Sequence, residues 1–159
     1  MKSFVVLAFL LGGCGTDDPV VVSGTYTVGV TNRDNGCNFA NWTVGAMNSG
    51  IAITVSQSAD KVTADVTGGT GLYLDIAFGS SAFTGTVDGN TLDLKLEGTR
   101  VQQSGTCTYT YNGEIQATTN GDLLTGKINY VPATNGNSDC AAVSGCLSYQ
   151  DFTGSRPPQ

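Results

Sequence analysis

Apolar and polar residues alternate along most of this chain, and that pattern constrains its fold more than any other feature. Tyr26, Val28 and Val30 alternate with threonine and glycine, and Leu92 and Leu94 alternate with charged residues. A period of two is typical of a β-strand with one face against a core. The pattern predicts strands at about 25–30, 51–56, 62–67, 83–87, 92–97, 108–117, 124–130 and 147–152, the last with ambiguous facing. No segment keeps a helical period over three turns.

Tight turns separate several of these segments. Asp88-Gly89-Asn90 and Asn120-Gly121-Asp122 predict hairpins, because glycine and asparagine accept a positive φ at low cost. Short strands joined by hairpins form a meander, and a long meander removes its exposed edges by closing. The sequence therefore predicts an all-β fold: an antiparallel, up-and-down β-barrel of eight strands, with nine as the alternative count.

The N-terminus has the layout of an export signal. Lys2 precedes an apolar run, Phe4 to Leu11, which is too short to span a bilayer as a helix. The run ends in Leu11-Gly12-Gly13-Cys14, which resembles the lipobox of bacterial lipoproteins. The alternative is an ordinary signal peptide with an incidental cysteine.

The lipobox resemblance implies cleavage before Cys14, lipidation of its thiol and anchorage to a membrane. In such lipoproteins an aspartate directly after the cysteine favours retention in the inner membrane. Here Gly15 takes that position, so the resemblance implies a location in the bacterial envelope, at the outer membrane. We expect a signal peptide at 1–13, a lipidated cysteine and tether at 14–22, one barrel domain at 23–153 and a disordered tail at 154–159.

Four cysteines remain besides Cys14: Cys37, Cys107, Cys140 and Cys146. An even number in an exported chain indicates two disulfides. With eight strands all four lie at one end of the barrel, whereas a ninth strand at 72–78 would move Cys37 to the opposite end. Bonded cysteines need Cα atoms within about 7 Å, so we expect eight strands. Residues 72–78 are then a helical or looped insertion, or a continuation of the third strand.

Strand neighbours suggest how the cysteines pair. The sixth and seventh strands are adjacent, which favours Cys107–Cys140, and the first and last strands meet at closure, which favours Cys37–Cys146. The alternative joins Cys140 to Cys146 and Cys37 to Cys107. A zinc site is a further alternative, but the chain has no histidine and no C-x2-C pair.

The predicted interior mixes large and small side chains. The large ones are Tyr26, Phe83, Tyr109, Tyr111 and Tyr130, and the small ones are Ala64, Gly85, Gly113, Ala117 and Gly126. Such a mixture either fills an eight-stranded barrel or leaves a narrow apolar pocket. The candidate ligand contacts are Tyr26, Trp42, Phe83, Tyr109, Tyr111 and Tyr130. The alternative is a transmembrane barrel, in which the apolar side chains would face outward into lipid. Such a barrel needs strands of about nine to eleven residues, and most of these segments have six to eight.

The sequence offers little for catalysis. Histidine is absent, and Asp65, Asp93, Glu97 and Glu114 fall on the polar face. Asp75, in the segment 72–78, is the one acidic residue that we consider as a catalytic candidate. Residues 34–36 and 135–139 resemble loose calcium loops but lack the full ligand spacing. We expect no enzymatic activity, metal or cofactor, and the net charge of −6 argues against nucleic acid as a partner.

A wider resemblance covers most of the chain. The lipobox, the segment Phe83-Thr84-Gly85-Thr86-Val87-Asp88-Gly89-Asn90 and the paired late cysteines are similar in layout to small lipocalin-like lipoproteins of bacterial envelopes. Tyr26 stands where lipocalins carry a tryptophan after Gly-x. The resemblance implies binding of a small apolar ligand in the barrel or at its mouth. The alternative function is a structural or adaptor module whose filled barrel presents its surface to another envelope protein.

Overall fold

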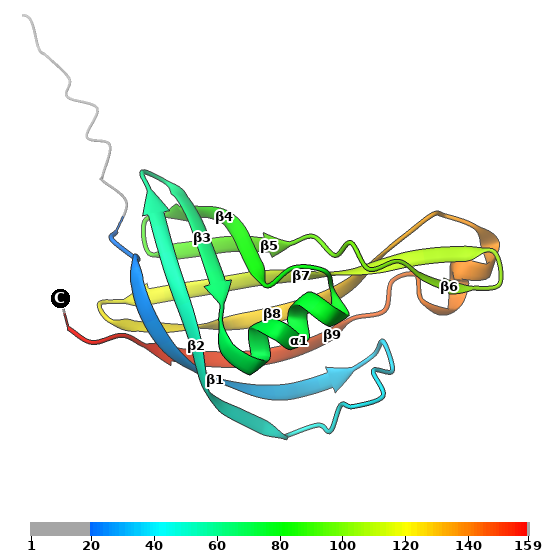
Figure 1. Ribbon diagram of the computed structural model, residues 1–159, viewed down its shortest axis with the longest axis horizontal. Helices are drawn as coiled ribbons and strands as arrows, with labels where there is room; N and C mark the ends of the chain where they lie inside the picture. The colour runs from blue at the N-terminus through cyan, green and yellow to red at the C-terminus, as the bar shows by residue number, and fades with distance from the viewer. Residues whose placement is uncertain (1–19, 159) are drawn as a thin grey trace, which may run out of the picture.

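The computed structural model describes residues 20–158, in which one antiparallel sheet closes on itself (Figure 1). Its strands are β1 (Gly24–Asn35), β2 (Met47–Ser58), β3 (Lys61–Val66), β4 (Ala82–Asp88), β5 (Thr91–Leu96), β6 (Gln102–Ser104), β7 (Cys107–Asn120), β8 (Leu123–Thr134) and β9 (Ser148–Ser155). Two helices complete the fold, α1 (Gly68–Ala77) and the 3-10 helix η1 (Ser138–Ala142). β1 pairs with β9 and β5 pairs with β7, which closes a ring of eight strands. β6 lies outside the ring and pairs with β7. The predicted antiparallel eight-stranded barrel is confirmed.

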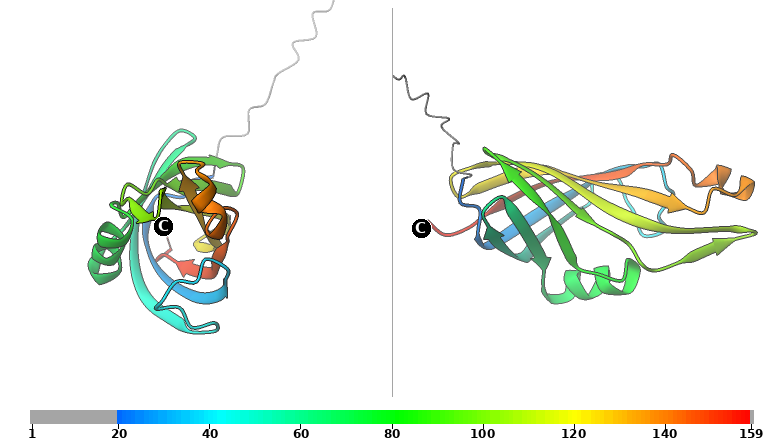
Figure 2. Two further views of the ribbon diagram at one scale, coloured as in Figure 1. Left: turned by 90° about the vertical axis from the view of Figure 1, so that its right-hand side faces the viewer. Right: turned by 90° about the horizontal axis from the view of Figure 1, so that it is seen from above.

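The two ends of the barrel differ in their connections (Figures 1 and 2). One end, the base, carries the short hairpins β2–β3, β4–β5 and β7–β8, and the described chain begins and ends there. Gly89 and Gly121 turn two of these hairpins with φ of 53° and 63°, as predicted. The other end, the mouth, carries the long connections, with α1 and η1 inserted in two of them.

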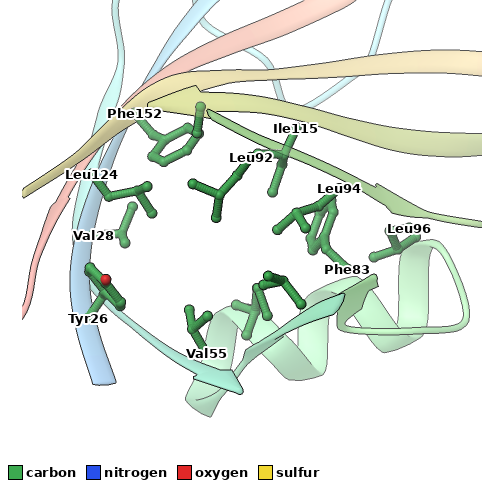
Figure 3. Close-up of a cluster of buried hydrophobic side chains, with 14 of the residues drawn as sticks. Tyr26, Val28, Val55, Phe83, Leu92, Leu94, Leu96, Ile115, Leu124 and Phe152 are labelled. Carbon is green, nitrogen blue, oxygen red and sulfur yellow. The ribbon is translucent and has the colours of Figure 1, made fainter. Parts of the chain in front are cut away.

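The apolar set of each strand lies inside the barrel. Figure 3 shows side chains that point toward the barrel axis, among them Tyr26, Val28, Leu92, Ile115 and Phe152. All of these are less than a tenth exposed. The intervening residues, such as Asp93 and Lys95 on β5, are exposed. The alternative facing, with apolar side chains outward, does not describe this barrel.

The barrel wall is taller on one side than on the other. β1, β2 and β8 have 12 residues and β7 has 14, whereas β3 and β5 have six and β4 has seven. The predicted lengths of six to eight residues were too short for β1, β2 and β8, and the ten residues predicted for β7 were also too few. The helix α1 lies beside the short strands and buries Leu74, with Phe78 buried directly after its end.

Residues 72–78 are therefore an insertion, mostly helical, and form neither a ninth strand nor a continuation of β3. Their alternating pattern resembles a strand, but the two buried positions, Leu74 and Phe78, are four residues apart and share one face of the helix. Within residues 20–158, no helix is both long and apolar enough to span a bilayer.

Both boundaries of the packed domain differ from those predicted. Val22, expected in the tether, is 1% exposed, and its N–H donates to Oε1 of Gln57 at 2.7 Å. At the other end β9 runs to Ser155, and the Arg156 guanidinium bonds to Asp122. The prediction of a disordered tail from residue 154 is thus wrong for residues 154–156. The predicted signal peptide and Cys14 lie outside the described residues.

Candidate functional site

Two disulfides hold the mouth of the barrel. Cys37 bonds to Cys146 and Cys107 to Cys140, each with a Cα–Cα distance of 5.0 Å, in the pairing that the strand order predicts. The first joins the end of β1 to the start of β9, across the seam where the barrel closes. The second joins the start of β7 to η1. The disulfides therefore fix the start of the β1–β2 connection and two points of the β8–β9 connection at the barrel rim.

The barrel interior contains an inner cavity of about 280 Å³. Most of its wall consists of aliphatic and aromatic side chains, several of which are visible in Figure 3. The lining residues with apolar side chains include Val28, Val30, Ile51, Ile53, Val55, Ala64, Val66, Leu74, Phe83, Leu92, Leu94, Ile115, Ala117, Leu124, Ile128 and Phe152. Since a water molecule occupies about 30 Å³ in the liquid, the volume equals that of about nine waters. The barrel is therefore not filled by its own side chains.

A second hollow, the mouth pocket, lies at the mouth and has a volume of about 440 Å³. Its walls come from the β1–β2 connection, from α1 and from the mouth ends of β7, β8 and β9: Phe39, Ala40, Asn41, Trp42, Tyr73, Leu74, Ala77, Phe78, Tyr111, Tyr130 and Gln150, together with Asn32 and Gln102. Five residues line both hollows, namely Asn32, Tyr73, Leu74, Tyr130 and Gln150. The mouth pocket is thus adjacent to the inner cavity and leads toward it.

Three of the shared residues form a hydrogen-bonded group, which we call the polar trio: Asn32, Tyr130 and Gln150. The Tyr130 hydroxyl donates to Oε1 of Gln150 at 2.8 Å, and Nε2 of Gln150 donates to Oδ1 of Asn32 at 2.6 Å. Asn32 and Gln150 are direct cross-strand partners on β1 and β9. The polar trio marks the boundary between the inner cavity and the mouth pocket.

Burial controls the ionisation of the interior tyrosines. Burial raises the pKa of Tyr130 well above its ordinary value of 10.0, and the neighbouring Tyr73 phenol adds a smaller contribution in the same direction. The pKa of Tyr111 is also raised, mainly by burial. All three members of the polar trio are therefore uncharged at neutral pH.

Tyr26 lies at the base end of the inner cavity, and its hydroxyl group is hydrogen-bonded within the protein. Its hydroxyl donates to the carbonyl of Val22 at 3.0 Å, and the Arg156 guanidinium lies 5.5 Å from its ring centroid. Burial raises the pKa of Tyr26, and the positive charge of Arg156 opposes that rise. The Tyr26 hydroxyl is thus hydrogen-bonded within the protein and its ring packs against Arg156.

The six predicted ligand contacts fall into four groups. Tyr26 and Phe83 line the inner cavity, Trp42 and Tyr111 line the mouth pocket, and Tyr130 lines both. Tyr109 lines neither hollow; its ring packs edge-on against Tyr111, with centroids 5.6 Å apart. The structure therefore places five of the six on one continuous surface.

An aromatic cluster covers one wall of the mouth pocket. The Phe39 ring lies 4.8 Å from that of Tyr111, 6.0 Å from that of Tyr130 and 5.8 Å from that of Trp42, measured between centroids. The Trp42 indole N–H donates to the carbonyl of Arg33 at 2.8 Å. These contacts fix the β1–β2 connection over the mouth.

Sequence reasoning missed Asn32, Gln150 and Phe39. The sequence did carry a signal for the first two. Every second residue of a strand faces the same side, so Asn32 faces inward with Val30, and Gln150 faces inward with Phe152. The apolar pattern stops before Asn32, so the first predicted strand ended at 30. Gln150 lies within the last predicted strand, 147–152, whose facing was ambiguous. Phe39 lies in a connection, where no periodic pattern applies.

The remaining residues singled out from the sequence lie apart from these hollows. Asp65, Asp75, Asp93 and Glu97 are exposed, and Glu114 is half-buried on the outward face of β7. In the loop 135–139 the Asp139 carboxylate accepts the N–H and the hydroxyl of Thr106 at 2.8 and 2.7 Å. Within residues 20–158, no three histidine, cysteine or acidic side chains gather as a metal site would require.

The inner cavity, the mouth pocket and the polar trio together form a candidate binding site whose geometry suits a small molecule. Comparison of the chain with protein-family models, with curated proteins and with solved structures finds no match, so its function is argued from the site alone.

Proposed function

We propose that this protein is a non-enzymatic binding protein of the bacterial cell envelope that holds a small apolar ligand inside its barrel. The observation that carries the proposal is the inner cavity of about 280 Å³ with its apolar wall. Binding pockets for small molecules are concave, mostly apolar and supplied with a few polar groups, and the inner cavity with its polar trio has this composition. The mouth pocket supplies the entry.

The adaptor alternative needs a barrel filled by its own side chains. A void of about nine water volumes in the centre of the barrel favours ligand binding over that alternative. An apolar void of this size left empty in solution destabilises a protein, because its wall atoms lack partners. An apolar ligand would supply those contacts.

The proposed location rests on two observations. Two disulfides are compatible with an oxidising compartment outside the cytoplasm. The lipobox-like Leu11-Gly12-Gly13-Cys14 supports lipidation and an outer-membrane anchor. Expression in a bacterial host tests the anchor: the wild-type chain should fractionate with membranes, and the variant Cys14→Ala should be released from them. Release of both alike would refute lipid anchorage.

Binding is tested with the neutral fluorescent probe N-phenyl-1-naphthylamine. We expect saturable binding by the wild-type protein and at least tenfold weaker binding by Ala64→Leu, because Ala64 lines the inner cavity and a leucine there occupies part of it. Ala133→Leu is the matched control, since Ala133 is exposed on β8. Thermal unfolding of both variants establishes that they are folded. Equal binding by the two variants, or no saturable binding by the wild type, would refute the proposed function.

A further inference from the structure

The inner cavity is not uniformly apolar, because the amide side chains that line it, those of Asn32, Asn48 and Gln150, lie toward the mouth, whereas the Tyr26 hydroxyl at the base is bonded to the Val22 carbonyl. Along β1 the inward residues run from Tyr26 at the base through Val28 and Val30 to Asn32 near the mouth. Along β9 the inward residues Phe152 and Gln150 follow the same order from base to mouth. A ligand that fills this cavity therefore meets hydrocarbon at the base end and amide groups at the mouth end.

The polar trio has hydrogen-bonding capacity to spare. Tyr130 donates to Gln150, and Gln150 donates to Asn32. An amide carries two N–H donors, and within residues 20–158 Nδ2 of Asn32 donates to no protein acceptor. Hydrogen bonds in a chain polarise one another, so the Asn32 N–H groups at the end of this chain are good donors. The oxygen of Tyr130 keeps its acceptor capacity.

The charged residues next to the polar trio in sequence point away from the site. Arg33 and Asp151 follow Asn32 and Gln150 on β1 and β9, and strand alternation places them on the outer face. There they pair with each other, with Nε of Arg33 2.7 Å from Oδ2 of Asp151. No charged side chain among the described residues lines the inner cavity or the mouth pocket.

This arrangement disfavours a charged ligand. Transfer of an unpaired carboxylate or ammonium group from water into an apolar site costs far more than transfer of a hydroxyl or carbonyl group that finds a hydrogen bond. At the polar trio an uncharged oxygen finds amide donors, and an ionic group finds no opposite charge. The site can therefore tell neutral amphiphiles from ionic ones of the same chain length.

We propose that the ligand is an uncharged amphiphile, with a hydrocarbon part in the inner cavity and a hydroxyl or carbonyl oxygen hydrogen-bonded at Asn32, Gln150 and Tyr130. This inference rests on the proposed function and names the class of ligand for the same site. The volume of the inner cavity limits the size of this ligand. A dry cavity of about 150 Å³ binds benzene, so about 280 Å³ accommodates a group of about ten non-hydrogen atoms by proportion.

The test compares three ligands of equal chain length in competition with N-phenyl-1-naphthylamine: decan-1-ol, decanoate at pH 8 and decylammonium at pH 7. We expect decan-1-ol to displace the probe at a concentration at least tenfold lower than either ion, each ion being kept below its critical micelle concentration. Equal or stronger displacement by decanoate or decylammonium would overturn the inference and leave the proposed function standing. Failure of the probe itself to bind would instead remove the proposed function.

A variant then tests the polar trio directly. Asn32→Leu keeps the size of the side chain and removes the amide, so its affinity for decan-1-ol should fall about fivefold to tenfold while its affinity for the neutral probe stays within about twofold. Asn129→Leu, on the outer face of β8, is the matched control and should change neither value. Unchanged binding of decan-1-ol by Asn32→Leu would show that Asn32 does not hold the oxygen and would overturn the assignment of the head-group site.

Discussion

The base and the mouth of this barrel use polar groups in opposite ways. At the base, the Arg156 guanidinium donates to the carbonyls of Val21 and Ser23 and pairs with Asp122, so its donors serve the chain itself. At the mouth, the inward amide groups of Asn32 and Gln150 bond to each other and still face open volume.

The difference separates stability from binding. A buried polar group stabilises a fold when its hydrogen bonds are made within it, and at the base each guanidinium nitrogen of Arg156 donates to the protein. A polar group with capacity left over and a cavity in front of it is suited to a ligand. We therefore expect changes at the base to alter the free energy of unfolding, and changes at the polar trio to alter binding.

The largest effect is expected from the disulfides at the mouth. In the chain-entropy description, a bridge across 109 residues contributes about 5 kcal/mol to the free energy of unfolding and one across 33 residues about 4 kcal/mol. The double variant Cys37→Ser/Cys146→Ser should thus be less stable than Cys107→Ser/Cys140→Ser, as measured by chemical denaturation. It should also bind the neutral probe more weakly, since its bridge anchors the connection that carries Phe39 and Trp42. The reverse order of stability would contradict the view that the Cys37–Cys146 bridge secures the seam.

A smaller loss is expected at the base. The Arg156 side chain is 7% exposed and its partner Asp122 is 37% exposed. Breaking a fully buried pair costs about 3–5 kcal/mol, and the partial exposure of Asp122 lowers this, so Arg156→Ala should cost about 2 kcal/mol. Affinity for the neutral probe should stay within about twofold. Arg100→Ala is the matched control, because Arg100 is exposed, and its cost should lie within about 0.5 kcal/mol of zero. A large loss of affinity in Arg156→Ala would contradict the separation of base from mouth.

Much of the fold follows from the local alternation of apolar and polar residues along the strands. Two of the site residues that were missed lie where an inward polar side chain interrupts this alternation. Eight strands and their hairpins were predictable because apolar residues face inward at every second position. The inward amide of Asn32 interrupts that pattern, which is why the first strand was predicted to end at 30. Gln150 interrupts it inside the last predicted strand, 147–152, whose facing was therefore ambiguous. The same two residues belong to the candidate site. At Asn32 the short predicted strand and the missed site residue thus have one cause, an inward polar residue that locally resembles the end of a strand. At Gln150 the strand was predicted and only the inward facing of the side chain was missed.

The helix α1 shows the opposite error. Leu72, Leu74, Ile76 and Phe78 alternate as a strand would. In the structure Leu72 and Ile76 are 62% and 65% exposed, and only Leu74 and Phe78 are buried. The segment is helical and lies against β2 and β3, with Leu74 and Phe78 packed inward, and its local alternation does not reveal this placement. Tertiary context decides such cases against local pattern.

The Tyr130 hydroxyl gives a third test, with a smaller effect. Removal of its hydrogen bond to Gln150 in Tyr130→Phe should cost about 1 kcal/mol at neutral pH. Because the folded-state pKa of Tyr130 is raised above 10.0, its contribution to stability is fully present below pH 10 and is lost as the pH rises further. The stability gap between wild type and Tyr130→Phe should therefore narrow above pH 10, as followed by denaturation at each pH. In the ultraviolet titration of tyrosinate, Tyr130→Phe should lack the latest phase. A variant that retains this late phase would show that another tyrosine ionises last.

The smallest effect is expected where β6 and β7 extend beyond the barrel. The Asp139 carboxylate there is fully exposed, and its two hydrogen bonds from Thr106 lower its pKa below 3.8, the backbone N–H contributing most. A depressed pKa contributes stability that is present above pH 3.8 and is lost as the pH falls through the folded-state value. We expect the NMR signal of the Thr106 amide to titrate with a midpoint below 3.8. In Asp139→Asn that titration should vanish without a change in binding of the neutral probe. A midpoint at or above 3.8 would mean that the contact with Thr106 does not persist in solution, and that the bridge from Cys107 to Cys140 alone fixes η1 to β7.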